Sequence, residues 1–151
     1  MIPMLNFVEL YEKHADYVFF MCSRFETDNE RADTLNHDVW RRIRRQLPQL
    51  QGAHEETWLC RKIVDTHRRL ARSFRPLPDL TDSVRRRSPI VRFKKALDRL
   101  NLEYRWPLVL KECAGFSYAE ISEILEVPTG TVRARLGRAR GMLARYQEDD
   151  L

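Results

Sequence analysis

Apolar residues return at three- and four-residue steps along most of this chain, and that spacing is typical of amphipathic helices. In the first segment, from about residue 7 to 25, the repeating positions are Phe7, Leu10, Tyr11, His14, Val18, Met21, Cys22 and Phe25. After a polar break, a second segment repeats Ala32, Leu35, Val39 and Ile43. Thr27 and Glu30 have the spacing of a capping box, so we expect the second helix to begin there.

The third predicted helix, from about Glu55 to Phe74, has two different stripes. Its apolar stripe comprises Leu59, Ile63, Thr66, Leu70 and Phe74. The opposite stripe comprises Arg61, Asp65, Arg68, Arg72 and Arg75. This basic face could follow a phosphate backbone, while the alternative is an ordinary charged surface in contact with water.

A segment rich in proline and charge, from Arg75 to Pro89, interrupts the helical pattern and is interpreted as a linker. Beyond it, apolar positions repeat again, but Pro107 lacks the amide proton that a helix interior needs. That helix should therefore begin close to Pro107 or be kinked there. No segment has the sustained alternation of strands, so the sequence predicts an all-α protein with two small helical domains, at 1–75 and 91–151, joined by a linker at 76–90.

The strongest local motif follows Gly115. Ser117 and Glu120 have capping-box spacing at the start of a short helix that should end at Leu125. After a tight connection at 126–129, a second apolar stripe repeats Val132, Leu136, Ala139 and Leu143. Two helices joined by so short a turn are predicted to form a helix-turn-helix.

Small residues occupy the outward side of the second helix of this motif. Gly130, Ala134, Gly137 and Gly141 fall together there at 100° per residue, with Arg133 and Arg138 beside them. Small side chains let a helix approach a groove of DNA, and arginines reach phosphates or guanine. Packing against another helix is the alternative, but the flanking arginines favour DNA.

The composition of the chain limits the classes of function that are possible. The chain of 151 residues has a net charge of +5 and a pI near 9.4, which suits a polyanionic partner. Its three widely spaced cysteines predict no disulfide framework, and we expect a cytoplasmic protein with no signal peptide and no membrane insertion. The four histidines lack ligand spacing, and no phosphate-binding glycine loop is present, so we expect no metal, no cofactor and no enzyme.

The segment GFSYAEISEILEVPTGTVRARLGRAR, from Gly115 to Arg140, closely resembles region four of the extracytoplasmic-function (ECF) sigma factors, members of the sigma-70 family. The residues from about 10 to 72 resemble region two of that family more weakly. The resemblance implies that the protein recruits core RNA polymerase to promoters and initiates transcription. It also implies three sets of contact residues.

Contacts to the minus-thirty-five element are implied for Thr129, Gly130, Thr131, Arg133, Ala134, Arg135, Gly137 and Arg138. Contacts to the minus-ten element are implied for Trp58, Arg61, Lys62, Asp65, Arg68, Arg69 and Arg72, although Trp58 could instead be a core residue. Contacts to the beta-prime clamp helices of the polymerase are implied for Thr34, Leu35, His37, Asp38 and Trp40.

The chain departs from the family pattern at three of these positions. Thr34 stands where the family usually has an acid, His37 where it has glutamine, and Asp65 where it often has asparagine. A phosphate on Thr34 would restore negative charge to the polymerase-facing helix, which makes a Ser/Thr kinase a candidate partner beside an anti-sigma factor. Two other functions stay open: a sigma-like decoy that binds a regulator, and a dimeric helix-turn-helix regulator that reads two half-sites.

Overall fold

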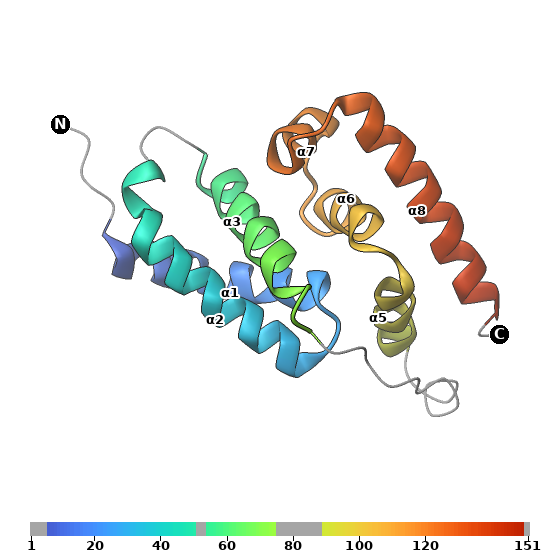
Figure 1. Cartoon of the computed structure of the whole chain (residues 1–151), viewed down its shortest axis with the longest axis horizontal. Helices are drawn as coiled ribbons and strands as arrows, with labels where there is room; N and C mark the ends of the chain where they lie inside the picture. The colour runs from blue at the N-terminus through green and yellow to red at the C-terminus, as the bar shows by residue number, and fades with distance from the viewer. Residues whose placement is uncertain (1–5, 51–53, 75–88, 150–151) are drawn as a thin grey trace.

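The computed structural model describes residues 6–50, 54–74 and 89–149, and these ranges form helices joined by short turns (Figure 1). The N-terminal region contains α1 (Phe7–Phe25), α2 (Asn29–Gln46), the 3-10 turn η1 (Leu47–Leu50) and α3 (Glu55–Leu70). The C-terminal region contains α5 (Pro89–Arg99), α6 (Leu102–Glu112), α7 (Tyr118–Leu125) and α8 (Thr129–Asp149). The all-α prediction is confirmed.

The N-terminal region is a three-helix unit, in which α1, α2 and α3 each contact the other two. Many of the fully buried side chains at its centre come from three- and four-residue repeats: Leu10, Val18, Met21, Phe25, Leu35, Val39, Ile43, Leu59 and Ile63. These positions belong to the stripes that the sequence predicts, because each helix turns its three- and four-residue repeat toward the other two.

The C-terminal region packs around α6, which contacts both α7 and α8. Leu97 of α5, Leu110 of α6, Ile121 of α7 and Val132 of α8 are fully buried there. The short α7 and the long α8 are joined by a tight turn, so the predicted helix-turn-helix is confirmed.

Two helix starts differ from the sequence prediction. Helix α2 is capped by the side chain of Asp28, which accepts from the Arg31 amide, while the Thr27 hydroxyl donates to Asp98 of α5. The predicted Thr27–Glu30 capping box is therefore wrong, because a partner distant in sequence takes the Thr27 side chain. Helix α6 begins at Leu102 and carries Pro107 in its interior, so the first of the two expected alternatives, a start close to Pro107, is wrong, while a kink at Pro107 stays a prediction.

The two regions pack directly on one another. Helix α7 lies against α3, and α6 lies against α1. In Figure 1, α3 therefore stands between α2 on one side and α6 and α7 on the other, whereas α8 lies at the outer edge of the C-terminal region. Helix α3 is buried on several sides, and α8 on one.

The cysteines Cys22, Cys60 and Cys113 are free thiols. Burial raises the pKa of the Cys60 thiol to about 12 and that of Cys113 above its ordinary value. A thiol with a raised pKa holds little thiolate near neutral pH, so these residues act as small apolar side chains. Among the described residues, no helix has the length and apolar character required to cross a bilayer.

Candidate nucleic-acid interface

The helix-turn-helix is fixed by local interactions at both ends of α7. At its start the Ser117 side chain accepts from the Glu120 amide, and the Glu120 carboxylate accepts from the Ser117 amide at 3.0 Å. This bond to the Ser117 backbone holds the pKa of Glu120 below its usual value. At its end Glu126 adopts φ 56° and ψ 45°, a left-handed conformation that turns the chain into α8.

Helix α8 is anchored on one side and open on the other. Val132, Leu136 and Ala139 are buried, and Arg140 donates twice to the Glu112 carboxylate of α6. These contacts hold the helix against α6 and α7. They leave the opposite side to solvent.

The eight residues of α8 predicted to contact the minus-thirty-five element are all exposed or half-buried. In the described structure, apart from the neighbouring residues and backbone of α8 itself, no atom lies within 4 Å of a Cβ built on Gly130, Gly137 or Gly141. The smooth face therefore does not pack against any other helix that the structure describes. It is open to the approach of a groove wall.

Arginines border this face of α8. Arg133 lies over the ring of Tyr118, at 5.3 Å from its centroid, and both Arg133 and Arg138 are exposed. The ring restricts the Arg133 guanidinium without neutralising it. A helix with a small-residue centre and charged margins can enter the major groove while its arginines reach phosphates or guanine.

The minus-ten candidates on α3 divide into two groups. Trp58 and Lys62 are buried, with the Lys62 ammonium 5.1 Å from the centre of the Trp58 ring. The indole is thus largely a core side chain, as the sequence alternative allows. Arg68, Arg69 and Arg72 are exposed, and Asp65 lies 3.7 Å from Arg68 in an ion pair.

Arg61 belongs to the same outward stripe but is occupied by the other region. Its Nη2 donates to the backbone carbonyl of Glu123 in α7 at 2.6 Å. Helix α7 thus covers the N-terminal part of the basic stripe on α3. The C-terminal part, beyond Asp65, stays exposed.

The polymerase-binding candidates on α2 also divide by burial. Leu35 is fully buried and Trp40 is 6% exposed, with its ring packed edge-on against Tyr11 at 4.8 Å between centroids. Both side chains point into the three-helix core, so the polymerase contacts implied for Leu35 and Trp40 stay a prediction that their exposure does not favour. Thr34 and His37 are exposed and Asp38 is half-buried, so these three share the outward side of α2.

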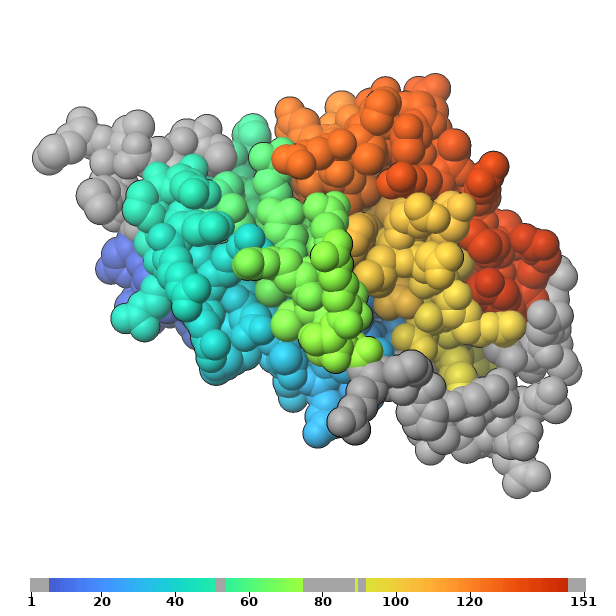
Figure 2. Space-filling model, in the orientation of Figure 1, coloured from blue at the N-terminus to red at the C-terminus, as the bar shows by residue number. Residues whose placement is uncertain are grey.

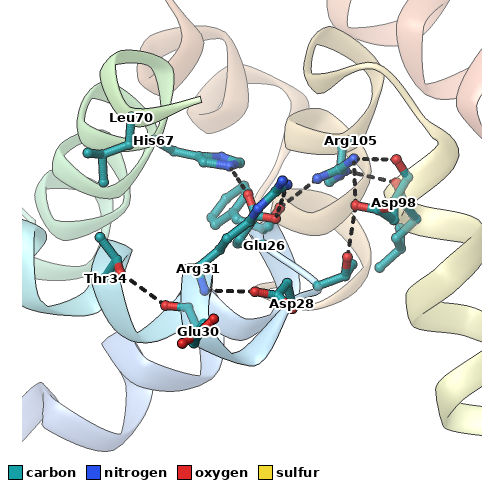
Figure 3. A network of polar contacts seen from close by, with 12 residues as sticks. Glu26, Asp28, Glu30, Arg31, Thr34, His67, Leu70, Asp98 and Arg105 are labelled. Carbon is teal, nitrogen blue, oxygen red and sulfur yellow. Dashed lines mark hydrogen bonds and ion pairs between the residues drawn. The ribbon is translucent and has the colours of Figure 1, made fainter. Parts of the chain in front are cut away.

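A buried polar network joins the two regions (Figure 3). The indole Nε1 of Trp106 in α6 donates to Nδ1 of His67 in α3 at 2.9 Å. Because an indole only donates, Nδ1 is the acceptor and the other ring nitrogen carries the proton. That Nε2 lies 2.9 Å from Oε2 of Glu26, so His67 donates to the carboxylate at the end of α1.

Arg105 of α6 completes the contact between the regions. Arg105 as a whole is 5% exposed, and its guanidinium donates to four backbone carbonyls, those of Phe25 in α1 and of Leu97, Asp98 and Leu100 at the end of α5. A cation at the carboxyl ends of two helices stabilises their unpaired carbonyls. Burial lowers the pKa of Arg105, but an arginine remains charged. We call Glu26, His67, Arg105 and Trp106 the clasp.

The sequence gives no signal for the clasp. No sequence motif links His67 with Glu26. Trp106 is recognisable only as an aromatic residue next to Pro107. Buried polar groups are almost always hydrogen-bonded, but only the tertiary structure reveals which partners they have. An alignment would be needed to detect such pairs from covariation.

Comparison with known proteins identifies the family. Residues 90–143 match the family model "Sigma-70, region 4". The chain is 31% identical to the ECF RNA polymerase sigma factor SigC of Mycobacterium tuberculosis, over 80% of this chain and 72% of that protein. It is also 31% identical to the ECF RNA polymerase sigma factor SigE of Mycolicibacterium smegmatis, over 95% of this chain. The chain belongs to the ECF sigma factors.

The matched part of this chain spans 62% of the length of that SigE protein. Its fold resembles the sigma factor RpoE from Bartonella quintana, solved in complex with the anti-sigma factor NepR, with a TM-score of 0.77 and 20% identity over 96% of this chain and 98% of that chain. This likeness covers both helical regions. The fold is therefore that of a two-region sigma factor.

Proposed function

We propose that the protein recruits core RNA polymerase to a defined set of promoters and starts transcription there, without catalysing a reaction itself. In this proposal residues 1–75 bind the polymerase and the minus-ten element, residues 76–90 link the regions, and residues 91–151 bind the minus-thirty-five element. Such a protein would work in the cytoplasm. The observation that supports the proposal best is the open, arginine-bordered face of α8 in a chain of this family.

Simultaneous use of both DNA elements requires the two regions to separate. The elements lie about 25 base pairs apart, or roughly 85 Å along B-DNA. A compact chain of this length has a radius of gyration of only about 15 Å. The packed form therefore binds one element at most, and the contacts from α7 to α3 and from α6 to α1 must break on the promoter.

The clasp makes this separation costly but reversible. Opening would expose the Glu26 carboxylate and the Trp106 indole to water, which can replace their hydrogen bonds. Core polymerase would supply the compensating free energy by binding the outward side of α2, where Thr34, His37 and Asp38 lie. An anti-sigma factor would oppose the separation of the two regions, because a protein that binds the packed form stabilises that form.

Run-off transcription with purified core polymerase on a library of promoter fragments tests the function. We expect transcripts from a small subset of fragments only when the protein is added. Binding to core polymerase without any transcript would contradict initiation and favour the decoy. Protection of two symmetrical half-sites without polymerase would favour a dimeric regulator.

Thr34 is the candidate for regulation by phosphorylation. Its side chain is exposed, and its hydroxyl donates to the Glu30 carbonyl one turn earlier (Figure 3). A phosphate there would add about two negative charges to the polymerase-facing side of α2. We expect Thr34→Glu to bind core polymerase more tightly than Thr34→Ala. Equal affinity of both variants and of the unmodified protein would reject this role.

A further inference from the structure

A cavity of about 470 Å³ lies where the two regions meet. The N-terminal region contributes Glu26 at the end of α1, Arg31 of α2 and Phe74 beyond α3 to its wall. The C-terminal region contributes Asp98 of α5 and Leu102 of α6. Figure 2 shows the green surface of α3 directly beside the yellow surface of the C-terminal region. Because both regions form the wall, the cavity exists only while they are packed together.

An acid and a base face each other in this cavity without a hydrogen bond between them (Figure 3). Oε1 of Glu26 is buried and has no hydrogen-bond partner. Nη1 of Arg31 lies 3.7 Å from it, which is close enough for an ion pair but too long for a hydrogen bond. The Arg31 side chain is 18% exposed and has no hydrogen bond to a described residue. An acceptor and a set of donors are thus left unused side by side.

The other charged side chains of the wall are an arginine and an acid. The guanidinium of Arg105 donates to four backbone carbonyls and has little capacity left. Asp98 accepts from the Thr27 hydroxyl through Oδ1, and its side chain is 30% exposed. Two acids and two arginines therefore give the charged part of the wall no net charge.

The rest of the wall combines apolar side chains with an open helix start. Phe74, Leu100 and Leu102 supply the apolar part. Asn101 occupies the N-cap position of α6, but its side chain makes no capping hydrogen bond. The amides of Leu102 and Glu103 donate to no described residue. Free amides in the first turn of a helix favour a carboxylate near them.

We propose that this cavity binds a free α-amino acid with an apolar side chain, and that the bound amino acid holds the two regions together. Its ammonium donates to Oε1 of Glu26, its carboxylate accepts from Arg31 and from the start of α6, and its side chain lies on the apolar wall. Entry requires the Arg31 side chain to move, which breaks no hydrogen bond with a described residue.

The paired charges select this class of ligand. A simple amine would meet the positive charge of Arg31, and a simple carboxylic acid would meet the negative charge of Glu26. An α-amino acid carries both charges on one carbon, so it matches both residues. The size of the cavity is in the range of small-molecule sites in proteins.

The effect on transcription rests on the proposed function, whereas the binding itself does not. A ligand that binds only the packed form stabilises that form by the factor 1 + [L]/Kd. At ten times its Kd, the amino acid favours the packed form about elevenfold. The affinity for core polymerase, which requires the regions to separate, should fall by about the same factor.

The direct test is an NMR titration of the isotope-labelled full-length protein with leucine and with phenylalanine, observed at the indole protons. The indole of Trp106 donates to His67 in the cavity wall, so its signal should shift and saturate with a Kd of roughly 0.1–1 mM. Trp40 and Trp58 lie outside the wall and should not shift. N-acetyl-leucine and leucinamide each lack one charge and should bind at least about tenfold more weakly.

A matched pair of substitutions at Asn101 separates binding from folding. Asn101→Asp adds an acid where the carboxylate of the ligand lies, so it should weaken leucine binding on the order of tenfold. The same change should not destabilise α6, because an acid is favourable at an N-cap. Asn101→Ser adds no charge and should change the affinity by less than about threefold. Thermal denaturation checks that both variants fold.

Two results of the titration would overturn the site. If the Trp106 signal does not saturate, the cavity holds water only. If leucine and its two analogues bind equally, or the two Asn101 variants bind leucine equally, the charges of the cavity do not select the ligand. Because the titration contains no polymerase, its failure and a failure of run-off transcription are separate results.

A second measurement tests the effect on the partner. Leucine at ten times its Kd should weaken binding of core polymerase about tenfold for the unmodified protein. At the same concentration it should weaken binding about twofold or less for Asn101→Asp. An unchanged affinity for polymerase while the Trp106 signal is saturated would show that the amino acid does not hold the regions together.

Discussion

The predicted contact residues of the two regions differ in their burial. On α8 none of the eight minus-thirty-five candidates is buried, whereas in the N-terminal region Leu35, Trp40, Trp58 and Lys62 are buried. The reason is position. Helix α8 packs through one side only, while α3 packs against α1, α2 and α7 and also contacts α6 through the hydrogen bond from Trp106 to His67.

This difference teaches how far a family motif identifies contact residues. Motif residues of an outer helix mostly face the partner, because the core needs only one side of such a helix. On an enclosed helix, some motif residues belong to the core and others to the contact surface. The burial of each side chain decides which of the two roles it has. The four predictions below test this division, from the largest expected effect to the smallest.

Trp40→Ala should destabilise the protein by about 3–5 kcal/mol, because it removes a buried aromatic side chain that packs on Tyr11. Urea denaturation measures the change. His37→Ala, on the exposed side of the same helix, is the control and should change stability by less than about 0.5 kcal/mol. A stable Trp40→Ala variant that fails only to bind polymerase would return Trp40 to the contact surface.

Gly137→Glu should separate stability from DNA binding. The side chain has open space, and replacing a helical glycine should stabilise α8 by roughly 0.5–1 kcal/mol. An acid at the centre of the DNA-facing side should nevertheless weaken binding to a minus-thirty-five duplex by about 100-fold or more. Thermal denaturation and anisotropy measure the two effects, with Gly137→Ala as the control that keeps the face smooth. Unchanged DNA affinity in Gly137→Glu would show that this face does not bind DNA.

Trp106→Phe should loosen the clasp. It leaves Nδ1 of the fully buried His67 without its donor, at a cost of about 1–3 kcal/mol. Trp58→Phe is the matched control, since it truncates another buried indole that has no hydrogen bond to a described residue. Hydrogen exchange at the contact of α3 with α7 should become faster in Trp106→Phe than in the control. Equal exchange rates would mean that the clasp does not hold the regions together.

Two backbone positions in the C-terminal region give the smallest expected effects, of opposite sign. Glu126→Gly should stabilise the protein by about 0.5 kcal/mol, because glycine adopts the left-handed conformation without strain. Gly115→Ala, at φ 73°, should destabilise it by about 1 kcal/mol for the same reason. Differential scanning calorimetry would detect both. Destabilisation by Glu126→Gly would mean that the Glu126 side chain matters more than the turn conformation.

Local rules predicted most of the elements. The bounds of α1 and the end of α7 agree with the structure, because Phe7, Phe25 and Leu125 delimit clear helical repeats. The Ser117–Glu120 capping box is likewise a local interaction, and it is confirmed. Contacts between distant segments could not be predicted in this way. Thr27 pairs with Asp98, and Arg61 pairs with Glu123, across 71 and 62 residues of sequence.

The candidate site shows the same limit. Glu26, Arg31 and Asp98 look like ordinary charged residues in the sequence until the packing of the two regions brings them to one cavity. The exposed face of α8 needs no such partner, since all its residues belong to one helix. A site built on one helix can therefore be recognised from sequence, whereas a cavity between several helices needs their relative placement.

The separation of the two regions on the promoter is the central claim, and a distance measurement tests it most directly. Spin labels on cysteines introduced at the exposed residues Asp33 and Arg145, with Cys113→Ser, would report the distance between α2 and α8, since Cys22 and Cys60 are buried. We predict one narrow, short distance in the free protein and a clearly longer one with core polymerase and promoter DNA. The same short distance in an actively transcribing complex would contradict the account.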